Sequence, residues 1–270
     1  MDRINTKLSQ KSLPVKHTNP SGMATVALLG VFICFILLPT DKLYAETLDE
    51  KFHLLQAKLE QLGQHYAVDE LKVVESMGLG NSEIQDADLA QLEILNNLKT
   101  LNLSMTGITD VGVAHLRNLE SLESLSLGWT AITNRGMAYI KEMERLKELS
   151  VVSTAVGDDG LVHLRGLAGL KKLYLGGTKV TNSGLVHLTG LKNLEKLVLW
   201  KTMVDDSGVP HLEKLHRLKS LDVTFTKISD SGVRQLRQAL PGCHIIGPEN
   251  LPKSKLDSIV SQVFSNSVYR

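Results

Sequence analysis

The chain has 270 residues, of which 43% are hydrophobic and 22% are charged, and its formal net charge is +1. This composition excludes a disordered or collagen-like chain, and so small a net charge gives no bulk electrostatic reason to bind nucleic acid. The two cysteines, Cys34 and Cys243, are too few for a disulfide-stapled domain or a cysteine-based zinc site.

The first 45 residues have the layout of an export signal. Residues 1–22 are polar and basic, and residues 23–39 are apolar apart from Thr25, carry no charge and end at Pro39. A basic stretch, an apolar run and a short polar stretch ending at Ala45 are typical of a secretory signal. The run is long for a cleaved signal and short for a span of about 20 residues. The remainder of the chain is therefore expected outside the cytoplasm, in a bacterial envelope. It is either secreted or periplasmic after cleavage, or anchored in the inner membrane by one N-terminal span.

Residues 46–66 are predicted to form one amphipathic helix. Its apolar residues recur at alternating steps of four and three, which places them on one face: Leu48, Phe52, Leu55, Leu59, Leu62 and Tyr66. Two interpretations stay open, because the helix either caps the open end of the following domain or forms a coiled coil in a homodimer.

A 24-residue repeat fills residues 71–246. Seven units begin, without any insertion, at Leu71, Leu95, Leu119, Met143, Leu167, Leu191 and Leu215. Positions 1, 4, 7, 9, 14, 19 and 22 of every unit are Leu, Ile, Val or Met. The alternation at positions 7 and 9 predicts a strand, and the later steps of three predict a short helix. One unit cannot bury its own apolar face, so the units are expected to stack.

Polar residues and glycines also recur at fixed positions of the unit. Position 15 favours a helix N-cap in six of seven units, and position 16 is always Asp or Asn, which suits the first turn of a helix. Glycine at position 18 in six units would weaken a helix, so we expect a close backbone approach there. Position 12 is Thr, or Ser in the first unit, and these hydroxyls are expected to satisfy backbone groups of a turn.

The pattern LxxLxxLxLxxTxITDxGLxxL resembles the short bacterial leucine-rich repeat, similar to the cysteine-containing class, with Thr in place of the usual Asn or Cys. The resemblance covers roughly two-thirds of the chain, and residues 240–246 resemble the closing strand of this family. It implies an α/β leucine-rich-repeat solenoid, curved, with a parallel sheet on the concave face and short helices on the convex face. Such proteins usually bind other proteins, and the resemblance implies no single activity.

The polar rows argue against catalysis. Asn134 and Asn182 replace Asp at position 16 without breaking the pattern, an exchange that a general acid would not tolerate. Four histidines share position 21: His115, His163, His187 and His211. Each would lie on its own helix, and helices pack about 8–10 Å apart, too far for shared zinc ligation. Since no phosphate loop, zinc motif or Ser/His/Asp spacing is present, we predict no enzyme, no metal and no cofactor.

Residues that the repeat does not require gather near the predicted concave strands. The aromatic ones are Trp129, Tyr174, Trp200 and Phe225, and the charged ones beside them are Lys172, Lys196, Lys201 and Asp222. Exposed aromatics beside lysine are typical of protein-binding surfaces. The alternative is that these rings pack over the turn edge of the sheet.

The sequence thus predicts a non-catalytic protein-recognition module that binds a protein partner, as a monomer or homodimer. The alternative is a structural or assembly protein that dimerises through residues 46–66. Residues 247–270 form a C-terminal tail, in which the spacing of four apolar residues favours one more helix: Leu256, Ile259, Val260 and Val263.

Overall fold

The computed structural model describes residues 40–247, with side chains from residue 47 onward. The predicted basic region 1–22, the apolar segment 23–39 and residues 248–270 of the tail lie outside this range. The chain divides into two compact units, Met1–Leu48 and Asp49–Arg270, and all packing below lies within the second. Between residues 40 and 247, no helix is both long and apolar enough to cross a membrane.

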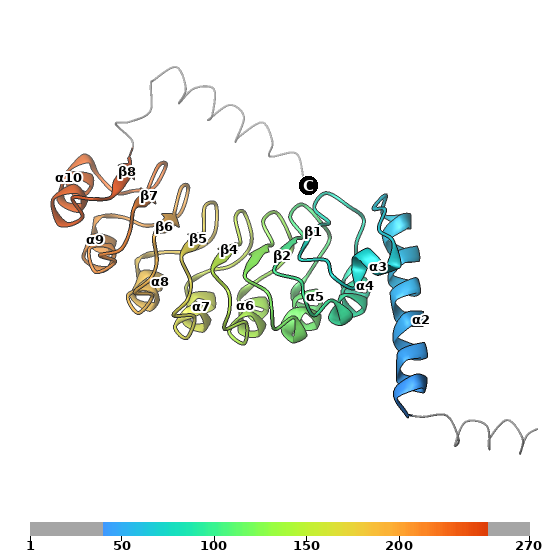
Figure 1. Cartoon of the computed structure of the whole chain (residues 1–270). Coiled ribbons are helices and arrows are strands. Elements are labelled where there is room, and N and C mark those ends of the chain that lie inside the picture. The colour runs from blue at the N-terminus through green and yellow to red at the C-terminus, as the bar shows by residue number, and fades with distance from the viewer. Residues whose placement is uncertain (1–39, 248–270) are drawn as a thin grey trace, which may run out of the picture. The chain divides into compact units, whose positions relative to one another are not determined.

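Eight short parallel strands form one sheet in chain order (Figure 1). They are β1 (Ser76–Gly78), β2 (Thr100–Asn102), β3 (Ser124–Ser126), β4 (Glu148–Ser150), β5 (Lys172–Tyr174), β6 (Lys196–Val198), β7 (Ser220–Asp222) and β8 (His244–Ile246). Each residue pairs with the residue 24 positions later, as Met77 does with Leu101. The register confirms the 24-residue repeat and the closing strand.

Short helices follow each strand and cover the other side of the solenoid (Figure 1). The α-helices are α3 (Val68–Leu71), α4 (Asp86–Leu89), α5 (Asp110–His115), α6 (Asn134–Ile140), α7 (Asp158–Leu161), α8 (Asn182–Leu185), α9 (Val209–Leu212) and α10 (Asp230–Ala239). The 3-10 turns are η1 (Ala90–Ile94), η2 (Leu116–Asn118), η3 (Val162–Leu164), η4 (Val186–Leu188) and η5 (Asp206–Gly208). The predicted strand, turn and helix of each unit are confirmed.

The core consists of the repeated apolar positions. Of the 49 residues at the seven apolar positions, 48 are buried, and the exception, Val74 of the first unit, is half-buried. Because neighbouring units bury these side chains together, no single unit has a core of its own.

A long helix closes the N-terminal end of the solenoid. Helix α2 runs from Thr40 to Gln61 and therefore ends earlier than the predicted residue 66, because Gly63 adopts a left-handed φ of +73°. Phe52, Leu55 and Leu59 are buried, and Lys58 Nζ lies 2.9 Å from Asp88 of the first unit. This packing supports the capping interpretation of the helix.

Threonine at position 12 closes the turn after each strand. Its buried hydroxyl donates a hydrogen bond to the carbonyl of position 9 in the same unit, for example Thr130 Oγ1 to Leu127 O at 2.6 Å. The predicted role of these hydroxyls is confirmed, and the bond lies within one unit.

The starts of the helices are tied together from unit to unit, an arrangement that we call the helix-start edge (positions 15, 16 and 18). The position-16 carboxylate of one unit accepts hydrogen bonds from position 15 of the next. Asp110, for example, accepts from Thr133 N at 2.8 Å and from Thr133 Oγ1 at 2.7 Å. Gly136 N at position 18 donates to the same carboxylate at 2.8 Å, and a Cβ there would lie 2.6 Å from Asp110 Oδ1. The expected close approach at glycine is therefore made by a side chain and not by backbone.

Candidate functional site

The structure separates the predicted site residues into strand and turn positions. Lys172 and Tyr174 lie in β5, Lys196 in β6 and Asp222 in β7, as predicted. Trp200 follows β6 by two residues. Trp129, Lys201 and Phe225 lie outside the strands, in turns with φ of 53°, 54° and 56°, so their predicted place on the concave strands is wrong.

The reason is that position 11 of every unit turns the chain away from the sheet. All seven residues there have positive φ: Asn81, Met105, Trp129, Ser153, Gly177, Lys201 and Phe225. The left-handed region suits glycine and asparagine, and other side chains enter it at a cost of about 1 kcal/mol. Residue type alone does not reveal this position, because five of its seven residues are not typical of left-handed turns.

Tyr174 lies on β5, Lys196 on β6 and Trp200 just after β6, and we call these three residues the aromatic cluster. Lys196 Nζ lies 5.1 Å from the centre of the Tyr174 ring, within the range of a cation–π interaction. Beside them, Lys172 Nζ donates to Glu148 Oε2 at 2.9 Å, and this hydrogen bond raises the pKa of Lys172. Tyr174, Lys196 and Trp200 are each partly exposed.

The indole of Trp200 lies over the backbone of the preceding unit. A Cβ on Gly176 would overlap the indole ring, and a Cβ on Gly177 would lie 3.5 Å from it. Gly176 is therefore part of the site, because only a residue without a side chain leaves room for the indole there. This arrangement has a sequence signal at position 10, where one unit carries glycine and the next unit carries a large residue.

Asp222 lies on the strand after Lys196, and its carboxylate is engaged within its own strand. Asp222 Oδ1 accepts hydrogen bonds from Thr224 N at 2.9 Å and from Thr224 Oγ1 at 2.7 Å. Trp129, in contrast, lies three units before Trp200 and shares its edge with Met105, and their exposed fractions are 56% and 58%. The predicted set of four aromatic residues thus divides into separate places.

The other half of the concave face is lined by small side chains. On β1, β2 and β3, the outward positions carry Ser76, Gly78, Thr100, Asn102, Ser124 and Ser126. Ser126 Oγ also lies 2.7 Å from Ser104 Oγ. No ionisable or aromatic group lies on these three strands, so the ionisable and aromatic groups of the sheet lie on β4 to β8.

The family model described as Leucine Rich repeat matches residues 95–116, 118–141 and 214–236. The solved structure of internalin C2 from Listeria monocytogenes is 26% identical, with a TM-score of 0.57 over 71% of this chain and 80% of that chain. The chain carries leucine-rich repeats and has the fold of a leucine-rich-repeat solenoid. An internalin (inlF) from Listeria monocytogenes is 23% identical with a TM-score of 0.57 over 72% of this chain, which spans 54% of that protein. No curated protein matches this leucine-rich repeat chain.

The polar rows of this leucine-rich repeat protein serve its framework. The aspartates of position 16 accept hydrogen bonds from the next unit, as Asp110 does from Thr133. His187 Nδ1 lies 2.6 Å from Arg165 Nη2, and burial followed by the Arg165 charge lowers the pKa of this histidine. No cluster of three or more potential metal ligands occurs within the described residues.

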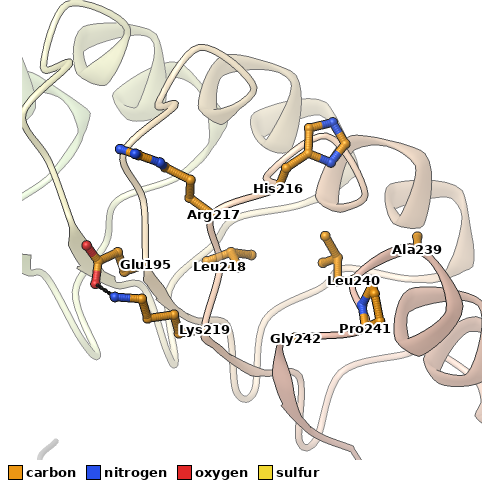
Figure 2. Close-up of a pocket in the computed structure, with 9 residues that line it drawn as sticks. All are labelled: Glu195, His216, Arg217, Leu218, Lys219, Ala239, Leu240, Pro241 and Gly242. Carbon is orange, nitrogen blue, oxygen red and sulfur yellow. Dashed lines mark hydrogen bonds and ion pairs between the residues drawn. The ribbon is translucent and has the colours of Figure 1, made fainter.

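A hollow of about 530 Å³ lies at the C-terminal end (Figure 2). Ala239 and Gly242 line it, along with Leu218. In its wall, Lys219 Nζ is paired with Glu195 Oε2 at 2.6 Å. Cys243 is close by in sequence, but burial raises the pKa of its thiol to about 11, so it is not poised as a nucleophile.

Proposed function

We propose that this leucine-rich repeat protein is a non-catalytic recognition module that binds another protein on its concave face. The observation that carries the proposal is the aromatic cluster, in which Tyr174 and Trp200 are held in place by Lys196 and Gly176 and remain partly exposed. Rigid aromatic rings beside basic groups are enriched at the centres of protein interfaces.

The extent of the cluster suits a protein segment. Adjacent strands lie about 4.8 Å apart, so side chains on β5, β6 and β7 spread over about 10 Å. A peptide or a protein surface can contact all three strands at once. Lys172 and Asp222 flank the cluster on the same strands, and Lys201 and Phe225 extend it along the turns.

Capture of a partner from envelope extract by the full chain tests this site. The double variant Tyr174→Ser, Trp200→Ala removes both rings of the cluster, and the matched control Met105→Ser, Trp129→Ala removes two exposed apolar groups at a distance. We expect the first variant to lose a partner that the native chain and the control retain, with unchanged circular dichroism. Equal capture by the native chain and both variants would contradict the concave site.

Export is part of this proposal and is supported by the basic residues 1–22 followed by the apolar residues 23–39. Cell fractionation with N-terminal sequencing tests it. A mature chain beginning at Glu46 would establish cleavage, and an intact chain in the inner membrane would establish an anchor. An intact chain found only in the cytosol would contradict export.

One observation favours the alternative of dimerisation through residues 46–66. Leu54 of α2 is 67% exposed and borders a hollow of about 330 Å³ together with Ala90 and Ile94. The remaining apolar face of the helix is buried against the first unit, which leaves little surface for a coiled coil. Sedimentation of the full chain and of Leu54→Lys distinguishes the two functions, since a dimer that Leu54→Lys dissociates would support the alternative.

A further inference from the structure

The charge of the solenoid changes sign along its length. Between residues 47 and 141, 13 acidic residues face 7 basic ones, whereas between residues 142 and 247, 15 basic residues face 11 acidic ones. The aromatic cluster lies in the second, basic stretch. A partner of the opposite charge would therefore be drawn toward the end of the solenoid that carries the cluster.

Local pairing leaves part of this positive charge uncompensated at β5. At position 5, Lys147 pairs with Glu123 at 2.7 Å and Lys219 pairs with Glu195 at 2.6 Å. Glutamate and lysine alternate at position 5 from the first unit to Lys147. The fifth unit breaks this alternation, because it carries a second lysine, Lys171, directly after Lys147. Lys171 is exposed and makes no ion pair with any group in the described part of the chain.

Lys196 is the second such group. Its ammonium lies over the Tyr174 ring and, within residues 47–247, forms no ion pair with a carboxylate. The acidic groups nearby are already engaged. Glu148 accepts from Lys172, and Asp222 accepts from Thr224. Glu195 accepts from Lys219, and the Lys171 charge also helps to lower the pKa of Glu195. The Lys196 ammonium thus lies over the Tyr174 ring, and Lys171 directly precedes β5, the strand that carries this ring.

We infer that the partner segment bound by the aromatic cluster is acidic, with carboxylates next to an aromatic or large aliphatic side chain. The carboxylates accept hydrogen bonds from Lys171 and Lys196, which are stronger than bonds between neutral groups. The apolar side chain packs on the outer face of the Trp200 indole. This inference rests on the proposed function and adds the chemistry of its partner.

Trp200 itself can report on binding. Trp129 and Trp200 are the only tryptophans of the chain, so Trp129→Phe leaves the fluorescence of Trp200 alone. The probes are three 12-residue peptides built from Leu-Tyr pairs alternating with two Glu, two Lys or two Ser residues. We expect the Glu peptide to shift Trp200 emission saturably, to bind at least about tenfold more tightly than the Ser peptide, and to weaken as salt is added.

Charge variants made in the Trp129→Phe chain show which lysines bind the Glu peptide. Lys171→Gln and Lys196→Gln are each expected to weaken the Glu peptide about tenfold. Lys192→Gln is the matched control, because this exposed lysine lies outside the concave strands and its loss changes the net charge equally. Glu and Ser peptides of equal affinity, or equal losses in the Lys192 and Lys196 variants, would overturn the inference. The proposed function would still stand if the Tyr174→Ser, Trp200→Ala chain lost its protein partner.

Discussion

The helix-start edge and the concave face differ in how much they vary from unit to unit. On the edge, the position-16 side chain accepts a hydrogen bond from the backbone N–H of position 15 of the next unit at each step, as Asp110 does from Thr133 and Asp158 does from Thr181. On the concave face, β2 presents Asn102 where β5 presents Tyr174. The comparison teaches that the edge and the core specify the framework. The residues on the outer face of the strands can therefore vary, and they are available to bind a partner.

Even the variation on the edge follows a rule. Position 16 is Asp wherever the next unit offers a Thr or Ser hydroxyl, and it is Asn before Gly157 and before Asp205. Asn182 Nδ2 donates to Asp205 Oδ1 at 2.7 Å, and Asn182 Oδ1 accepts from Asp205 N at 3.0 Å. The amide is therefore required there, because only it can donate to a carboxylate.

The largest effect is expected from a methyl group on the edge. In Gly160→Ala, the new Cβ would lie 2.8 Å from Asn134 Oδ1 and 3.0 Å from Val156 Cγ1. We expect a loss of about 2 kcal/mol in the free energy of unfolding, because overpacking outweighs the gain in helix propensity. The concave control is Gly78→Ala, where nothing lies within 4 Å of the new Cβ and urea unfolding should change little. Equal losses in the two variants would show that the two regions are equally constrained.

A smaller effect is expected from breaking the match between Asn and Asp. Asn182→Asp sets a second carboxylate against Asp205 and should lower the melting temperature at pH 7 by a few degrees. Repulsion raises the pKa of one carboxyl of the pair, so the deficit should shrink as the pH falls. Native Asp205 behaves in the opposite way, since hydrogen bonds from Ser207 and then Asn182 lower its pKa, so its stabilising charge is lost on acidification.

Asp205→Thr is the rescue for this variant. Added to Asn182→Asp, it recreates the hydroxyl and carboxylate of the other units and should restore the melting temperature. A double variant as unstable as Asn182→Asp alone would refute the matching rule.

At the turn edge, a substitution is expected to increase the free energy of unfolding. Trp129→Asn replaces a half-exposed ring in the left-handed region with a residue that tolerates it, so stability should rise by up to about 1 kcal/mol. Chemical denaturation measures the change. A marked loss of stability would mean that the indole is a packing element of the turn.

The smallest effect is expected from the ion pairs at the strand entrances. Lys99 Nζ lies 2.6 Å from Glu75 Oε1, but the exposed fractions of the two side chains are 47% and 62%. Lys99→Gln should therefore change the free energy of unfolding by less than about 0.5 kcal/mol. A loss comparable to that of Gly160→Ala would show that these pairs help to hold the stack.

Periodicity predicted the core well because it reports burial directly. The repeated apolar positions and the N-caps of position 15 follow from spacing within one unit, and the closing strand follows from the resemblance to leucine-rich repeats. Contacts that depend on stacking were not predictable in this way. The bond between Asn182 and Asp205, or the fit of Trp200 over Gly176, joins residues 23 or 24 apart whose proximity arises only once the units are stacked. The left-handed turn at Trp129 was also missed, because tryptophan does not favour that conformation.

The matching rule on the helix-start edge makes the units unequal as building blocks. Excision of residues 95–118 would bring Asp86 beside Thr133, which preserves a hydroxyl against a carboxylate. Excision of residues 167–190 would instead bring Asp158 beside Asp205 and set two carboxylates against each other. The solenoid can thus be shortened at some junctions and not at others. The Asp and Asn residues of position 16 determine which units can be neighbours.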